Sequence, residues 1–176
     1  MKNNYKVGVL TVSDRSFRGE REDLGGPLLK ELIEDLGFQV SETSIVPDEL
    51  EMIKNELIRL SDNEEIALIL TTGGTGFSPR DITPEATTQI SERLVPGIGE
   101  TMRAYSSKFT DRAYLSRATA GIRKRTLIIN FPGSPKAIKE NLEAIASPLE
   151  HGLDILRGDG PTNCATQILV NKFLII

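Results

Sequence analysis

The sequence has very few of the side chains on which covalent and metal-based catalysis most often depends. Among its 176 residues there is one cysteine, Cys164, and one histidine, His151. A single cysteine excludes an internal disulfide and a cysteine-cluster zinc site, and a single histidine excludes a histidine-pair metal site. Ser–His and Cys–His catalysis each lack a partner in this chain. We therefore expect carboxylates, backbone amides and a bound metal ion to carry any chemistry.

The sequence also lacks a long apolar run and a strong excess of one charge. No stretch approaches the roughly 20 apolar residues of a membrane span, and the N-terminal residues enter a strand pattern too early for a signal peptide. The 25 acidic and 21 basic residues give a formal net charge of −4, which offers no broad cationic surface to a nucleic-acid backbone. We expect a cytoplasmic protein that binds neither membranes nor nucleic acids.

Short apolar strand patterns alternate with amphipathic helix patterns along most of the chain. The expected strands cover 6–12, 39–46, 66–70 and 126–130, and the expected helices cover 27–36, 49–61, 84–93, 98–109 and the stretch from 135 onward. Strands separated by helices favour a parallel sheet that is covered on both faces. The sequence thus predicts one α/β domain over residues 1–157, Rossmann-like, in three layers with a mostly parallel central sheet, followed by a tail of unknown role at 158–176.

The chemistry-bearing residues follow the expected strands. In open sheets of this kind, ligands bind outside the carboxyl ends of the strands, where helix N-termini also converge. The segments at these positions are Ser13–Asp14, Pro47–Asp48, Thr71–Gly76 and Asn130–Ala137. We expect them to lie together at one edge of the sheet.

The segment Thr71–Gly76 reads TTGGTG, which is typical of a tight turn close to a ligand. Its amides can form an anion-binding nest, and the hydroxyls of Thr72 and Thr75 can add donors. No lysine follows the last glycine, as a P-loop requires, and the spacing differs from the dinucleotide fingerprint. Glycine content alone also fits a purely structural turn.

The segment NFPGSPKA has a similar design. A glycine turn precedes Ser134, which can cap a helix, and Pro135, which suits the first helical position. Lys136 then places a positive charge in the first turn, where an ordinary helix prefers an acidic side chain. A cation at this position is suited to a bound anion.

Two aspartates, Asp48 and Asp81, are expected at the same edge of the sheet. Either could instead cap a helix or a turn. Two carboxylates beside a phosphate nest are electrostatically costly unless a divalent cation lies between them, so we predict Mg²⁺ bound with a nucleoside triphosphate. Arg80 could pair with its neighbour Asp81 or grip a phosphate, and the sequence leaves both open.

Six separated motifs resemble the MogA/MoaB family of molybdopterin-binding proteins, which includes the gephyrin G-domain. They read TTGGTGFSPRDITPEA, VSDRS, VPDE, PGIGE, LSRATAGI and NFPGSPKA, and the resemblance runs in unbroken order over residues 6–157. It implies molybdopterin adenylyltransferase activity in molybdenum-cofactor biosynthesis, in which AMP passes from MgATP to the molybdopterin phosphate and pyrophosphate is released. It also implies a homotrimer and a molybdenum-insertion enzyme acting downstream.

The resemblance assigns the two essential aspartates of the family to Asp48 and Asp81, as catalytic and metal-binding residues. Family members without the activity replace the position of Asp48, so its presence favours the enzyme. With the residues already discussed, the predicted set for binding ATP and molybdopterin is Ser13, Asp14, Thr72, Gly73, Gly74, Thr75, Gly76, Arg80, Thr83, Glu100, Ser116, Arg117, Pro132, Gly133, Ser134 and Lys136.

Two other functions fit the same residues. One is a non-catalytic molybdopterin-binding or scaffold protein of this family. The other is a phosphatase or hydrolase that uses the same nest and aspartates without a pterin.

Overall fold

A single six-stranded sheet runs through the computed structural model, which describes residues 5–158. Its strands are β1 (Lys6–Val12), β2 (Gln39–Val46), β3 (Ile66–Thr72), β4 (Arg93–Leu94), β5 (Ala120–Arg123) and β6 (Thr126–Phe131). They lie in the order β2-β1-β3-β6-β5-β4. The pairs β2–β1, β1–β3 and β3–β6 are parallel, whereas β6–β5 and β5–β4 are antiparallel.

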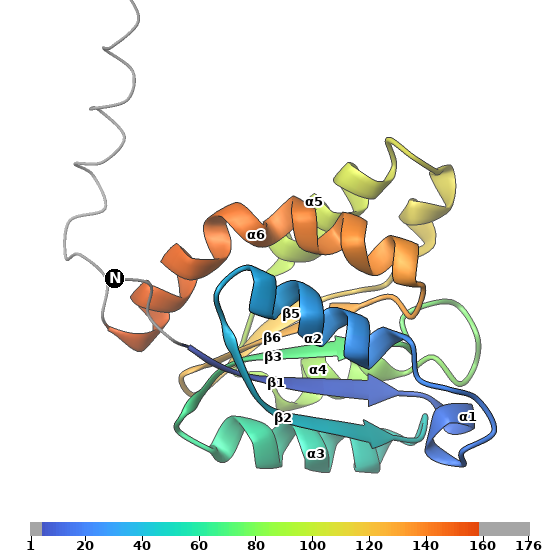
Figure 1. The fold of residues 1–176 in the computed structure, drawn as a ribbon, viewed down its shortest axis with the longest axis horizontal. Coiled ribbons are helices and arrows are strands. Elements are labelled where there is room, and N and C mark those ends of the chain that lie inside the picture. Colours follow the sequence, from blue (N-terminus) through green and yellow to red (C-terminus); the bar gives the residue numbers. More distant parts are fainter. Residues whose placement is uncertain (1–4, 159–176) are drawn as a thin grey trace, which may run out of the picture.

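Helices cover both faces of this sheet (Figure 1). The helical segments are α1 (Asp14–Phe17), α2 (Gly25–Asp35), α3 (Leu50–Asp62), α4 (Thr83–Ile90), α5 (Pro96–Ser106), the 3-10 turn η1 (Asp111–Leu115) and α6 (Pro135–Arg157). Helices α2, α5 and α6 pack on one face and α3 and α4 on the other. The three-layer, mostly parallel α/β fold predicted from the sequence is confirmed.

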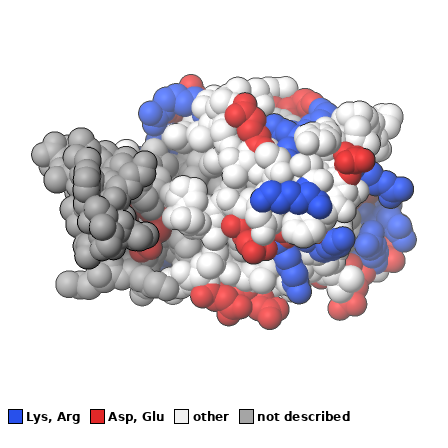
Figure 2. Space-filling view, turned by 90° about the horizontal axis from the view of Figure 1, so that it is seen from above, with Lys and Arg blue, Asp and Glu red and all other residues white. Residues whose placement is uncertain are grey.

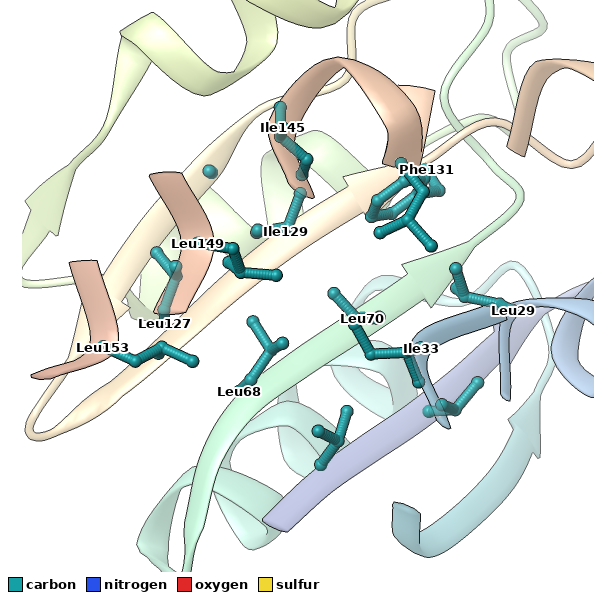
Figure 3. Close-up of a cluster of buried hydrophobic side chains, with 14 of the residues drawn as sticks. Leu29, Ile33, Leu68, Leu70, Leu127, Ile129, Phe131, Ile145, Leu149 and Leu153 are labelled. Atoms are coloured by element: carbon teal, nitrogen blue, oxygen red, sulfur yellow. The ribbon is translucent and has the colours of Figure 1, made fainter. Parts of the chain in front are cut away.

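The core consists of aliphatic side chains on the two faces of the central strands. Every residue of β3 is buried, which explains the continuous apolar run at 66–70 with which the strand begins. On one face, Leu68 and Leu70 contact side chains of α2 and α6, as Figure 3 shows. On the other face, Ile69 belongs to a second cluster with α3 and α4. The two clusters fix the strand ends that carry the loops described below.

The surface over α2 and α6 carries interspersed acidic and basic side chains around an uncharged area (Figure 2). Within residues 5–158, no helix combines the length and the hydropathy that a bilayer crossing requires. Apart from Gly158, the predicted tail lies outside the described residues.

The antiparallel edge formed by β4 and β5 was not predicted. Strand β5 has only four residues, and Gly121 within it lies so close to β4's neighbour Ser91 that a Cβ on the glycine would be 2.1 Å from the Ser91 hydroxyl. The turn to β6 passes through Lys124, which has the left-handed φ of 51°. A glycine or asparagine at this position would have indicated the turn in the sequence, but lysine does not. The basic residues Arg123 and Lys124 both pair with Asp62, at 3.1 and 2.9 Å.

We predict that Leu68→Ala lowers the free energy of unfolding by about 2–5 kcal/mol, because it opens a cavity under α6 in a fully buried strand. Met52→Ala on α3 is the control, since that side chain is 43% exposed, and its effect should stay within about 1 kcal/mol. Urea denaturation of both variants measures the difference. Equal losses would contradict this description of the core.

Candidate functional site

Two adjoining hollows lie at the carboxyl ends of the parallel strands, the edge at which β1, β2 and β3 end in Figure 1. The first hollow has a volume of about 240 Å³ and lies among the ends of β1, β3 and the start of α2. The second has a volume of about 430 Å³ and lies between the glycine loop and η1. The residues that line both are Gly73, Gly74, Asp81 and Gly133. These four form the boundary between the hollows.

The glycine loop is built into the sheet by backbone contacts. Gly73 and Gly74 have φ values of 100° and 62°, in the region that favours glycine. A Cβ on Gly73 would lie 2.2 Å from the carbonyl oxygen of Val12, at the end of β1. The Gly73 amide donates to the Phe131 carbonyl at 3.1 Å. The loop therefore joins the ends of β1, β3 and β6, and the Gly73 amide is not available to a phosphate as the sequence suggested.

Threonine hydroxyls hold this loop in place. Thr83 donates its hydroxyl to the Gly73 carbonyl at 3.0 Å and its amide to the Gly74 carbonyl at 3.1 Å. Thr72 donates to the Pro132 carbonyl at 3.0 Å, which fixes the second glycine turn. None of the hydrogen bonds among the described residues uses the amides of Gly74, Thr75 or Gly76. Of the amides in the predicted anion nest, these three remain open to a ligand.

Asp14 and Asp48 are linked by two reciprocal hydrogen bonds, each from the backbone amide of one residue to the carboxylate of the other. The Asp14 amide donates to the Asp48 carboxylate at 2.8 Å, and the Asp48 amide donates to the Asp14 carboxylate at 3.1 Å. Asp48 does not cap α3, because the residue at the N-cap is Glu49 and no side chain caps that end. Burial raises the pKa of Asp48, and the nearby carboxylates of Asp14 and Asp81 raise it further, against the hydrogen bond from the Asp14 amide. Its negative charge is poorly compensated by the protein.

Arg80 pairs with acidic residues of two other loops rather than with its neighbour Asp81. Its Nε and Nη2 donate to the Asp14 carboxylate at 3.1 and 2.8 Å, and its Nη1 donates to Glu49 at 2.8 Å. The hydrogen bond from Arg80 lowers the pKa of Asp14. Arg80 therefore ties the loops after β1, β2 and β3 together, although its side chain is about half exposed.

Arg117 lies behind the glycine loop and binds its backbone. The Arg117 amide donates to the Thr75 carbonyl at 2.9 Å, and its Nε donates to the Gly76 carbonyl at 2.7 Å. Its Nη2 donates to the Asp81 carbonyl, and its Nη1 forms an ion pair with Glu85. Arg117 was predicted to contact a ligand. That contact stays a prediction, and in the structure Arg117 positions the segment that carries Asp81.

The Asp81 carboxylate is oriented by the turn that contains it. Its Oδ2 accepts from the Ser78 amide at 2.9 Å, and the Asp81 amide donates to the Ser78 carbonyl at 2.9 Å. A Cβ on Gly76 would lie 2.8 Å from this Oδ2, so the glycine leaves room for the carboxylate. The turn-capping geometry that the sequence allowed is present, and the same carboxylate lines both hollows.

The structure brings most of the predicted residues together. Those that line a hollow are Ser13, Asp48, Thr72, Gly73, Gly74, Thr75, Gly76, Asp81, Ser116, Pro132, Gly133 and Ser134. Those that line neither are Asp14, Arg80, Thr83, Glu100, Arg117 and Lys136. Glu100 is exposed on α5. The Lys136 side chain is 75% exposed, and its Nζ lies 3.8 Å from Glu140 on the same helix.

Sequence reasoning missed several lining residues between β1 and α2. Asp23 accepts from the amides of Gly25 and Gly26 at 3.0 and 3.1 Å and from the Thr11 hydroxyl at 2.7 Å, so it ties the first turn of α2 to β1. The sequence Asp-Leu-Gly-Gly-Pro carries this signal, since an aspartate precedes a proline-containing first turn. Two exposed arginines also line the site, Arg21 in the first hollow and Arg112 in the second. Nothing in the sequence around either residue indicated this position.

The arrangement suits a metal ion that arrives with a phosphate. No group of three or more His, Cys, Asp or Glu side chains able to hold a metal occurs within residues 5–158. Asp48 and Asp81 do line the same hollow, and each raises the negative potential at the other. Mg²⁺ is commonly bound by one or two carboxylates together with substrate phosphates. The residues present fit such a shared site.

We predict that Arg117→Lys lowers the free energy of unfolding by about 1–3 kcal/mol, because lysine cannot satisfy two carbonyls and a carboxylate from one planar group. Hydrogen exchange of the amides at residues 75–81 should accelerate, while that of β3 should change only with global stability. The control is Arg18→Lys, whose arginine also makes two hydrogen bonds to a carboxylate, that of Glu20, but is exposed. Unchanged exchange in the loop would refute the positioning role.

Comparison with known proteins places the chain in a family. Residues 8–151 match the family described as a probable molybdopterin binding domain. The chain is 43% identical over 155 residues to the molybdopterin adenylyltransferase of Helicobacter pylori strain J99, covering 87% of this chain and 88% of that protein. It is 43% identical over 146 residues to the molybdopterin adenylyltransferase of Escherichia coli K12, covering 81% of this chain and 74% of that protein.

A solved relative has the same fold. The crystal structure of the molybdopterin biosynthesis enzyme MoaB from Thermus thermophilus is 48% identical, with a TM-score of 0.83, and the match covers 89% of this chain and 98% of that one. The sequence match, the fold and the loops at the strand ends agree with one another. The chain therefore belongs to the molybdopterin-binding domain family of molybdenum-cofactor biosynthesis proteins.

Proposed function

We propose that this protein is a molybdopterin adenylyltransferase that transfers AMP from ATP to the terminal phosphate of molybdopterin and releases pyrophosphate. The observation that carries the proposal is the pair of hollows that share Gly73, Gly74, Gly133 and Asp81. A reaction between two phosphate-bearing molecules needs two binding sites that meet where the phosphates react. The relatives named molybdopterin adenylyltransferase support the same reaction.

The chain can catalyse this reaction mainly by positioning. An oxygen of the molybdopterin phosphate forms a bond to the α-phosphorus of ATP, and the bond from that phosphorus to the bridging oxygen breaks, so that the electron pair leaves with pyrophosphate. Transfer of this kind requires little covalent chemistry from the protein. The unused amides of Gly74, Thr75 and Gly76 belong to residues that line the second hollow, and they can donate to phosphate oxygens. The scarcity of histidine and cysteine is then no obstacle.

Asp48 and Asp81 would hold Mg²⁺ against the triphosphate. The ion, when bound, neutralises charge on the phosphates and on the pyrophosphate leaving group. The raised pKa of Asp48 fits this role, because burial and two neighbouring carboxylates disfavour its charged form and a bound cation would favour it. The Asp14 amide keeps the carboxylate in one orientation before any ligand arrives.

Arginines would supply the remaining positive charge. Arg21 lines the first hollow and Arg112 the second, so each phosphate-bearing molecule would meet one guanidinium. The anion-stabilising role expected for Lys136 stays a prediction, and in the structure its Nζ lies 3.8 Å from a carboxylate oxygen of Glu140. Our proposal also includes a homotrimeric assembly, expected from the family resemblance, and a cytoplasmic location, expected from the sequence pattern. Light scattering tests the assembly.

We predict that Asp81→Asn lowers adenylyl transfer at saturating MgATP by about 10²- to 10³-fold, because one preorganised electrostatic contact to the developing charge is lost. Asparagine can still accept from the Ser78 amide, so the melting temperature should change little. Asp35→Asn, an exposed change at the end of α2, is the matched control and should keep full activity. Near-normal turnover in Asp81→Asn would remove Asp81 from the catalytic machinery.

We predict that Gly74→Ala abolishes MgATP binding in a folded protein. A Cβ here would lie 2.3 Å from the Thr83 hydroxyl and 3.3 Å from an Asp48 carboxylate oxygen, at a φ of 62°. Gly97→Ala is the control, because nothing lies within 4 Å of the Cβ position at Gly97. Titration calorimetry with MgATP compares the two. Equal affinities would show that the boundary between the hollows does not contact the nucleotide.

A further inference from the structure

An apolar groove lies between α5 and α6, away from the site described above. We call it the α5–α6 groove. Its volume is about 310 Å³, and its walls are mainly aliphatic side chains, among them Val95, Ile98, Ile122, Ile145, Leu149 and Leu156. Several of these residues are only partly buried, although they pack on the core cluster under α6. An open apolar surface of this kind favours a partner that removes it from water.

Two glycines keep the groove open. Gly97 lies in the first turn of α5 and Gly152 lies inside α6, and both line the groove. A Cβ at either position would meet no atom within 4 Å, so neither glycine is required by the packing of the described residues. A glycine inside a helix makes the helix less stable than an alanine at the same position. The two glycines leave room for another segment to approach the helix backbones closely.

The sequence after α6 has the composition for this role. Helix α6 ends at Arg157, and Gly158 adopts the left-handed conformation with φ 79°, which commonly ends a helix and turns the chain. Leu156, which lines the groove, lies two residues before this turn. After a connector at 159–167 the sequence reads ILVNKFLII over 168–176, where seven of nine side chains are aliphatic or aromatic.

The connector is long enough to reach the whole groove. Nine extended residues span at most about 30 Å. The stretch of α6 from Ile145 to Leu156, which lines the groove, is about 17 Å long at the rise of an α-helix. A segment tethered in this way has an effective concentration on the order of millimolar at its own groove, which favours it over a separate molecule of the same composition.

We propose that residues 168–176 of the same chain bind in the α5–α6 groove and cover it. The apolar side chains of the segment suit the apolar walls of the groove. Gly97 and Gly152 leave space for the segment beside the helix backbones. The groove is then an intramolecular docking site, separate from the two hollows at the carboxyl ends of the strands.

A photocrosslink within the full-length chain tests this proposal. With Phe173 replaced by benzoylphenylalanine, irradiation should link position 173 to peptides from α5 or α6, and the product should keep the mass of one chain on a denaturing gel. Peptide mapping by mass spectrometry identifies the linked residues. A product of two chains would assign the groove to a second copy and overturn the proposal, as would links confined to other parts of the chain or no link at all.

A variant that fills the groove provides the second arm. Gly152→Leu in the crosslinkable chain should reduce the link to α5 and α6 at least fivefold, because the added side chain occupies the open space. His151→Leu adds the same side chain at the neighbouring exposed position, which does not line the groove, and should leave the link unchanged. The melting temperature shows that each variant folds. An equal yield in both variants would show that the segment does not use the groove.

Discussion

The whole site depends on one close approach, that of Gly73 to the end of β1. No side chain fits between them, since a Cβ would lie 2.2 Å from the Val12 carbonyl oxygen. The Gly73 amide also donates to the carbonyl of Phe131 at the end of β6. A Cβ on Gly133 would lie 3.5 Å from the Cα of Gly73. Two loops and three strand ends are thereby joined through backbone atoms. The boundary between the hollows, and the placement of Asp81 beside it, follow from this junction.

The charges of the site are arranged for ligands rather than for stability. Asp14, Asp48 and Asp81 lie near one another, and the nearby Arg80 pairs with Asp14 and Glu49. Burial raises the pKa of Asp48, and the two neighbouring carboxylates raise it further. Carboxylates crowded in this way cost folding free energy, and such costs are typical of preorganised functional sites. Hydrogen bonds from backbone amides keep these carboxylates in place without neutralising them. The main example is the reciprocal pair of hydrogen bonds between Asp14 and Asp48.

The sequence predicted the parallel part of the fold because that part has strong local signals. The aliphatic run of β3 and the amphipathic pattern of α3 each identify an element without reference to the rest of the chain. Strand β5 has only four residues and turns at Lys124, so it carried no comparable signal. Asp48 and Asp81 were found because a position after a parallel strand is informative by itself.

The roles of the arginines could not be predicted because they depend on contacts between distant parts of the chain. Arg80 pairs with Asp14, which is 66 residues away, and Arg117 binds the Asp81 carbonyl across 36 residues. The family motif identified both as important positions. Only the fold distinguishes a side chain that contacts a ligand from one that holds the loop behind it.

The central claim is that this chain joins the phosphate of molybdopterin to AMP. The most direct measurement is to incubate the unmodified protein with molybdopterin and MgATP, and to follow adenylyl-molybdopterin by mass spectrometry and pyrophosphate by enzyme-coupled assay. The account predicts one pyrophosphate for each adenylylated pterin and no release of either phosphate or pyrophosphate when the pterin is omitted. Molybdopterin that binds but is never adenylylated, or phosphate released from ATP in the absence of the pterin, would contradict it.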